Sequence, residues 1–190
     1  MTDTGMPPGE TFCLYDSAQL NAVLDGMARQ AAGLLIGRSE VAMIGILRRG
    51  EPLARMLQER LTRQFGLDSL PLYSLRLKRY ADDLTLLHPQ TELTENPQLA
   101  ALNVAHTTLL VVDDVLYHGH SLLRTIAYLA RLGATEIRTA VLVDRGAEKL
   151  PVRADIIGVR LDVAPTDIIE CHVPPYEAEL RIDVLRRRQA

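Results

Sequence analysis

The sequence predicts an α/β protein built on a mostly parallel sheet with helices on both faces. Short apolar runs alternate along the chain with segments in which apolar residues recur every three or four positions. Runs that are apolar throughout suit strands buried on both faces, whereas the other spacing is typical of amphipathic helices. This alternation favours parallel strands joined by helices, and ligands of such sheets bind at the carboxyl ends of the strands.

Composition narrows the class of protein. The chain has 190 residues, enough for one domain with a sizeable core, and 47% hydrophobic residues, which is ordinary for a soluble globular protein. A net charge of −3, with no single basic stripe, disfavours nucleic-acid binding as the main task. We expect no secretory signal and no membrane span, because no apolar run approaches the roughly 20 residues required. Cys13 and Cys171 lie far apart without metal-type spacing, which favours the reducing cytoplasm.

The first half of the chain predicts two helices and two strands. Asp16 and Gln19 have the spacing of a capping box at the start of the first helix, and Pro52 suits the first turn of the second. Alternating side chains mark the second strand. In chain order the predicted elements are a helix over 17–36, a strand over 41–47, a helix over 52–63 and a strand over 70–77.

The second half continues the alternation after a long polar stretch. Residues 78–106 have no clear period before 98–104, and long loops inside compact domains are usually functional or mobile. The elements predicted after this stretch are a strand over 109–114, a helix over 119–132, and strands over 138–144 and 154–159.

Asp113 and Asp114 end the apolar run LLVVDD and precede the loop that leads through Gly119 into the next helix. A helix N-terminus presents unpaired N–H groups that favour a phosphate, and glycine lets the backbone approach the anion closely. The two carboxylates suit ribose hydroxyls or a hydrated Mg²⁺ that accompanies a polyphosphate. A pair of helix-capping acids is the structural alternative, and two acids at a strand end favour the ligand site.

Four segments carry a resemblance to a known family. VVDDVLYHGHS (111–121) resembles the phosphoribosyl-diphosphate (PRPP) signature of type I phosphoribosyltransferases, and its tyrosine is similar to that of the pyrimidine-operon attenuator/uracil phosphoribosyltransferase branch. GILRRGEPLA (45–54), YADDLTLLHPQ (80–90) and AVLVDRGAEKLPVRADIIG (140–158) resemble the diphosphate loop, flexible loop and hood segments of that family, in a consistent order.

The resemblance implies the type I phosphoribosyltransferase fold, with a twisted, mostly parallel five-stranded sheet, helices on both faces and a small hood. It also implies a homodimer. We expect a flexible N-terminal tail over residues 1–16 and the phosphoribosyltransferase domain over 17–160. The divergent residues 161–190 would complete the hood or form a subunit contact.

The resemblance also implies a set of site residues. The diphosphate loop would contain Arg48, Arg49 and Gly50, and family members often have a cis peptide there. Mg²⁺ would be bound through PRPP, with Asp113 and Asp114 as candidate ligands. The implied catalytic residues are Arg48, Arg49, Arg79 and Asp114. The implied substrate-binding residues are Gly50 for the diphosphate, Asp113 and Asp114 for the ribose, Tyr117, His118, Gly119, His120, Ser121 and Leu122 for the 5′-phosphate, and Asp144 and Arg145 at the base.

Departures from the family pattern leave the activity open. The family usually has threonine at 118 and arginine at 120, where this chain has His118 and His120, and it has arginine in place of Ala81. Arg79 could compensate for the last change or be a solvated charge. The main hypothesis is a Mg²⁺-dependent transferase that converts uracil and PRPP to UMP and diphosphate, although the base could differ.

The alternative hypothesis is a catalytically weak or inactive nucleotide-sensing regulator of pyrimidine metabolism that retains the nucleotide pocket. RNA binding, known in this family, is less favoured because the net charge is negative.

Overall fold

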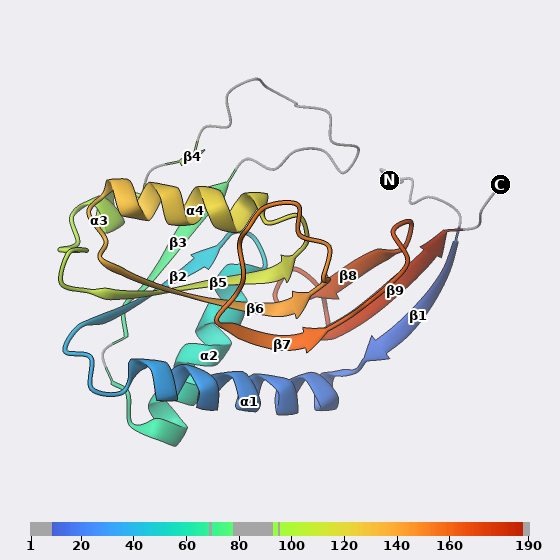
Figure 1. The fold of residues 1–190 in the computed structure, drawn as a ribbon. Coiled ribbons are helices and arrows are strands. Elements are labelled where there is room, and N and C mark those ends of the chain that lie inside the picture. Colours follow the sequence, from blue (N-terminus) through green and yellow to red (C-terminus); the bar gives the residue numbers. More distant parts are fainter. Residues whose placement is uncertain (1–8, 69, 78–92, 95, 188–190) are drawn as a thin grey trace.

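The structure, a computed structural model, describes residues 9–68, 70–77, 93–94 and 96–187 (Figure 1). Its central sheet has six strands in the order β4-β3-β2-β5-β6-β7. Five of them are parallel, and β4 pairs antiparallel with β3 at one edge. The strands are β2 (Val41–Ile46), β3 (Leu72–Leu77), β4 (Leu93–Thr94), β5 (Thr108–Leu116), β6 (Glu136–Asp144) and β7 (Ile156–Arg160). The predicted parallel five-stranded sheet is therefore confirmed.

Helices cover both faces of this sheet, as predicted (Figure 1). On one face, Leu24 and Leu57 pack in one core cluster with Leu110 of β5. On the other face, Leu129 packs with Val111 of the same strand. Burial of both faces explains the apolar sequence of β2 and the continuous apolar runs 109–112 of β5 and 140–143 of β6. The helices are α1 (Ser17–Leu35), α2 (Gly50–Phe65), α3 (Pro97–Ala100) and α4 (His120–Arg131).

Helix α1 begins with the predicted capping box. The Asp16 carboxylate accepts a hydrogen bond from the Gln19 backbone N–H, and the Gln19 side chain accepts one from the Asp16 N–H, both at 2.9 Å. Each bond satisfies a donor that the start of a helix leaves unpaired. Helix α2 begins at Gly50, two residues before the predicted start at Pro52, so part of the predicted diphosphate loop belongs to its first turn.

The hood is a separate antiparallel sheet in the order β1-β9-β8, formed by β1 (Gly9–Tyr15), β8 (Ile168–His172) and β9 (Arg181–Arg187). Residues 9–15 were predicted to belong to a flexible tail, and this prediction is wrong. They form a strand because a partner near the other end of the chain supplies the hydrogen bonds, with Phe12 opposite Val184. Residues 1–8 lie outside the described part.

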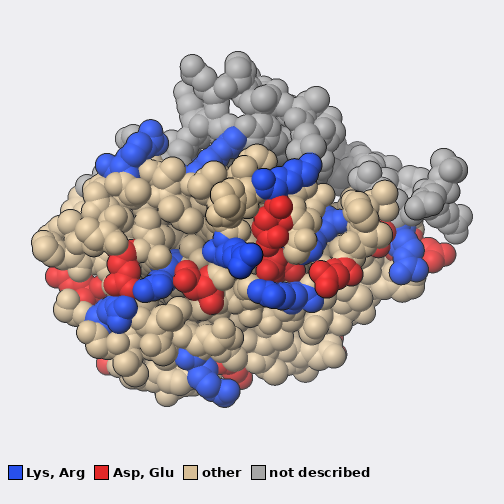
Figure 2. All heavy atoms as spheres, viewed as in Figure 1, with Lys and Arg blue, Asp and Glu red and all other residues tan. Residues whose placement is uncertain are grey.

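Charged side chains of both signs are interspersed on the face shown in Figure 2, which has the view of Figure 1. Within the described ranges, no helix combines the length and the apolar character needed to cross a membrane.

Candidate functional site

The candidate site lies at the carboxyl end of the central sheet, where the segments after β2, β5 and β6 come together (Figure 1). A Cβ atom at Gly50 would collide with the carbonyl oxygen of Val112, so the start of α2 lies directly against β5. The Arg145 N–H donates to Leu116 O at 3.0 Å, and the Lys149 N–H donates to His118 O at 3.3 Å. These backbone contacts join the three predicted binding segments at the carboxyl end of the sheet.

The segment after β2 contains Arg48 and Arg49. The Leu47–Arg48 peptide is cis, as the resemblance implied for the diphosphate loop. Glycine is required on both sides of this loop, because a Cβ atom at Gly45 would collide with the Cα atom of Glu51, just as one at Gly50 would collide with β5. The close approach places this loop against β5, where Arg49 lies near Asp114.

Asp113 and Asp114 lie inside β5 rather than at its end, because the strand continues to Leu116. Both carboxylates are buried, with exposed fractions of 4% and 5%. Asp113 Oδ1 accepts a hydrogen bond from the Asp114 N–H at 2.9 Å, and Asp114 Oδ1 accepts one from the Val115 N–H at 3.0 Å. Asp114 Oδ2 is 4.0 Å from Arg49 Nη1, which connects the acidic pair to the diphosphate loop.

The predicted phosphate loop turns sharply into α4. Gly119 is the N-cap of the helix with φ +86°, in the left-handed region that favours glycine. Its Cα packs close to Leu150 and Val152, because a Cβ atom there would already be 3.5 and 3.6 Å from their Cβ atoms. The segment after β6 therefore supports the loop, while the side chain of Leu122 is buried in the core. The N-terminus of α4, which includes Ser121, lies at this end of the sheet, and the first N–H groups of a helix have no partner within the helix itself.

Aromatic rings occupy the start of this loop. The Tyr117 and His118 rings are stacked with centroids 3.7 Å apart, and the His120 ring is 6.3 Å from that of His118. Burial lowers the pKa of His118, and the positive charges of Lys149 and Arg145 lower it further. The imidazole of His118 is therefore neutral near pH 7 and supplies a polar group rather than a full positive charge.

Asp144 lies at the end of β6, where it was predicted to border the base pocket. Its Oδ1 accepts a hydrogen bond from the Gly146 N–H at 2.9 Å, and its Oδ2 is 3.6 Å from Arg160 Nε. The carboxylate is 6% exposed. Asp144 thus stabilises the turn that follows β6 and contacts the end of β7.

Arg145 connects this turn to the hood. Its Nη2 donates to the carbonyl oxygens of Asp167 at 2.6 Å and Ala164 at 3.0 Å. Its guanidinium carbon lies 4.4 Å from the centre of the Tyr117 ring. Arg145 therefore holds the segment before β8 against the phosphate loop, a structural contribution that its sequence position alone did not reveal.

The structure adds residues that the sequence did not identify. Tyr176 and Glu177 follow β8 and lie against the diphosphate loop, where Arg49 Nη2 donates to Glu177 Oε1 at 2.5 Å and Arg48 lies 5.4 Å from the Tyr176 ring. Glu177 and Arg49 are 128 residues apart, so no spacing pattern could have paired them. Arg79 and Ala81 lie outside the described residues.

The carboxylates of the site are the described groups that could hold a magnesium ion. Among the described residues, no group of three or more His, Cys, Asp or Glu side chains is arranged to hold a metal ion. Asp113 and Asp114 nevertheless provide oxygen ligands of the kind that Mg²⁺ prefers. Mg²⁺ is usually bound by one or two carboxylates together with substrate phosphates, and this pair matches that pattern.

Comparison with known proteins agrees with this geometry. Residues 14–179 match the phosphoribosyl transferase domain family. Bifunctional protein PyrR from Elusimicrobium minutum is 34% identical over 177 residues, which cover 90% of this chain and 95% of that protein. Bifunctional protein PyrR from Caldicellulosiruptor bescii is 31% identical over 172 residues, which cover 89% and 92% of the two chains.

Solved structures show the same fold. Hypoxanthine phosphoribosyltransferase from Trypanosoma cruzi, in complex with the product IMP, has a TM-score of 0.74 at 16% identity, covering 94% of this chain and 95% of that one. Such low identity shows the fold alone, whereas the family match spans most of the sequence. The chain therefore belongs to the phosphoribosyltransferase family.

Proposed function

We propose that this protein transfers the phosphoribosyl group of PRPP to a pyrimidine base, with uracil and PRPP giving UMP and diphosphate. The observation that carries the proposal is that the Arg48–Arg49 loop packs against β5 with its two buried aspartates, and that the same strand leads into the glycine turn at Gly119. The resemblance of Tyr117 to the tyrosine of the pyrimidine-operon attenuator/uracil phosphoribosyltransferase branch supports a pyrimidine base over a purine.

The reaction exchanges one bond at the ribose. The bond from C1 of the ribose to the diphosphate oxygen breaks, a bond forms between C1 and N1 of uracil, and the N1 proton leaves. Positive charge develops on the ribose and negative charge on the leaving group. In this proposal Asp113 and Asp114 hold the ribose hydroxyls, and Arg48 and Arg49 stabilise the departing diphosphate.

Mg²⁺ would enter on PRPP and neutralise part of the diphosphate charge. The adjacent carboxylates of Asp113 and Asp114 would hold the ion directly or through its water molecules. The N–H groups at the start of α4 would bind the 5′-phosphate, with the Ser121 hydroxyl as a further donor.

The test is a direct assay of the purified full chain. With PRPP, Mg²⁺ and uracil, we expect UMP and diphosphate in equal amounts, and no UMP when Mg²⁺ is removed with a chelator. Cytosine, hypoxanthine and guanine serve as competing bases that define specificity. Product from a purine alone would replace the pyrimidine assignment, and no product from any base at high protein concentration would contradict the transferase proposal.

A nucleotide-sensing role is the second candidate, and a specific observation favours it. His120 and Ala81 stand where the family usually has arginines, so two cations that would contact the anionic substrate are missing. The word bifunctional in the names of the relatives supports a second role beside catalysis. Calorimetry with PRPP, UMP and UTP separates the two functions, because tight nucleotide binding without turnover supports the sensor.

RNA binding and dimer formation stay predictions. The interspersed charges in Figure 2 do not favour a nucleic-acid surface on that face. Salt-dependent binding to a pyrimidine-operon leader RNA would support such a role all the same. Light scattering of the purified chain tests the predicted homodimer.

A further inference from the structure

The turn between β8 and β9, which contacts the diphosphate loop, is held by hydrogen bonds among its own residues. The N–H groups of Tyr176 and Glu177 both donate to Val173 O, at 3.1 and 3.3 Å. In return, the Val173 N–H donates to Glu177 Oε2 at 2.8 Å. Val173 itself is fully buried in the core. The Glu177 carboxylate is therefore fixed to a well-anchored turn rather than carried on a free loop.

This fixed carboxylate binds one edge of Arg49. Arg49 Nε donates to Glu177 Oε1 at 3.2 Å, and Arg49 Nη2 donates to the same oxygen at 2.5 Å. The remaining nitrogen, Nη1, lies 4.0 Å from Asp114 Oδ2. The guanidinium is thus oriented with one edge against the hood and the opposite nitrogen toward the acidic end of β5.

Both partners are charged in this pair. Burial by itself would raise the pKa of Glu177, but hydrogen bonds from Arg49 and Val173 outweigh it and hold that pKa below its ordinary value. Burial likewise acts to lower the pKa of Arg49, and the contact with Glu177 reverses the direction. The side chains are 27% and 22% exposed, so solvent screens the pair only in part.

We propose that Glu177 is a positioning residue that orients Arg49 for the diphosphate of PRPP. A guanidinium has five N–H donors, and Glu177 occupies only the edge formed by Nε and Nη2. The end formed by Nη1 and the second N–H of Nη2 keeps the geometry for a bidentate contact with a phosphate. Without Glu177, Arg49 turns toward Asp114, its nearest other carboxylate, and loses this orientation. The inference rests on the proposed function of the site.

The contact between Glu177 and Arg49 could instead compete with diphosphate, and this role predicts the opposite change in diphosphate affinity. If Glu177 competed with diphosphate for Arg49, removal of its negative charge would strengthen diphosphate binding. If Glu177 orients Arg49, its removal weakens diphosphate binding even though the site loses a negative charge. The sign of the change in affinity therefore distinguishes a positioning residue from a competing one.

The experiment compares Glu177→Gln with Glu179→Gln in the full chain. Glu179 is an exposed residue two positions away, so its substitution makes the same change of charge outside the contact. We expect Glu177→Gln to raise the Kd for magnesium diphosphate and the KM for PRPP roughly tenfold, with the KM for uracil unchanged. Glu177→Asp should restore part of the affinity, and Glu179→Gln should match the wild type.

A double-mutant cycle with Arg49→Ala tests whether Glu177 acts through Arg49. In the Arg49→Ala background, Glu177→Gln should have no further effect on the Kd for diphosphate. An effect of Glu177→Gln that persists in the Arg49→Ala background would overturn the inference. Diphosphate binding by the single variant Glu177→Gln that is unchanged or tighter would overturn it as well. Either result would leave the proposed function intact. A wild-type chain that binds neither PRPP nor diphosphate would overturn the proposed function and this inference with it. Thermal unfolding of each variant shows that the fold is retained.

Discussion

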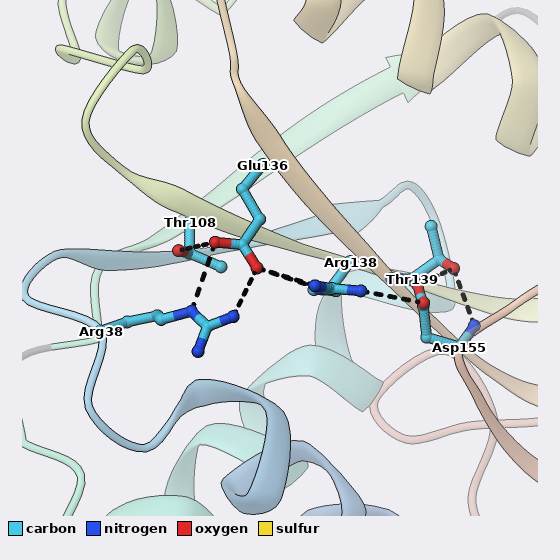
Figure 3. A network of polar contacts seen from close by, with 6 residues as sticks. All are labelled: Arg38, Thr108, Glu136, Arg138, Thr139 and Asp155. Atoms are coloured by element: carbon cyan, nitrogen blue, oxygen red, sulfur yellow. Dashed lines mark hydrogen bonds and ion pairs between the residues drawn. The ribbon is translucent and has the colours of Figure 1, made fainter.

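The amino and carboxyl ends of the central strands carry polar clusters that differ in how acidic and basic side chains are arranged. At the amino ends of β5 and β6, carboxylates alternate with arginines and threonines (Figure 3). Glu136 accepts hydrogen bonds from Arg38 at 2.8 Å, Arg138 at 2.9 Å and Thr108 at 3.1 Å. At the carboxyl end of β5, two aspartates are adjacent and buried, and Arg49 is 4.0 Å from one of them.

The difference concerns how charge is balanced. The amino-end network continues from Arg138 to Asp155, which also accepts hydrogen bonds from both the N–H and the hydroxyl of Thr139. Each charge there has an opposite charge beside it, so the network connects the beginnings of β5, β6 and β7. Asp113 and Asp114 are instead two carboxylates buried at consecutive positions of one strand, and the burial of carboxylates costs stability. Buried ionisable groups cluster at functional sites, which agrees with the proposed role of Asp113 and Asp114.

The largest expected effect separates function from stability at the carboxyl end. Asp114→Asn should lower kcat/KM for PRPP at least about a hundredfold, because it removes a charge from the side of the site that we propose holds the ribose and Mg²⁺. The free energy of unfolding should change by less than about 1 kcal/mol, because the lower cost of burying a neutral amide offsets the lost attraction to Arg49. Initial-rate kinetics and urea unfolding measure the two quantities. A large loss of stability with normal kinetics would reverse the comparison.

A substitution at Gly50, where the start of α2 lies against the backbone of β5, should have the next largest effect. Gly50→Ala should lower the free energy of unfolding by about 1–3 kcal/mol and weaken PRPP binding, because the new methyl group meets the backbone of β5. Gly26→Ala in α1 is the matched control. A Cβ atom at Gly26 meets nothing within 4 Å, so this change should stabilise the protein by about 0.5–1 kcal/mol. Equal effects of the two changes would refute the close approach.

Substitution at the amino end should affect the fold and leave the site intact. Glu136→Gln weakens the contacts to Arg38 and Arg138 and should lower the free energy of unfolding by up to about 1 kcal/mol, since the network is partly exposed. Kinetic constants for PRPP and the base should stay at wild-type values. A loss of turnover in this variant, with its melting temperature unchanged, would mean that the two ends are coupled.

The smallest expected effect is the pH dependence of the stability that Glu136 contributes. Hydrogen bonds from Arg38 and then Arg138 lower the pKa of Glu136 from 4.5 to about 2. A lowered pKa in the folded state contributes stability that is fully present above pH 4.5 and is lost as the pH falls toward 2. Urea unfolding of wild type and Glu136→Gln between pH 6 and pH 2 should therefore give stabilities that converge on acidification. A constant difference across that range would show that Glu136 is not held ionised by its neighbours.

Local patterns predicted most of the central fold. Five parallel strands, α1, α2 and α4 follow from apolar spacing, and the capping box at Asp16 follows from two residues three positions apart. The boundaries were less accurate: β5 extends past Asp114 to Leu116, so the aspartates lie within the strand. The acidic pair and the Gly119 turn were identified because their chemistry is contiguous in the sequence.

The sequence by itself determined the class of fold, the order of its strands and helices, and the segments that meet at the carboxyl end of the sheet. The fold class and the order of elements depend on periodicity and turn residues, which act over a few positions. The segments of the site were implied by the resemblance of contiguous motifs to the type I phosphoribosyltransferases. The tertiary structure alone decided that residues 9–15 form a strand, that Arg145 holds the hood to Tyr117, and that Glu177 contacts Arg49. Such contacts join residues that are distant along the chain, and no local pattern records which distant partner the folded chain brings near.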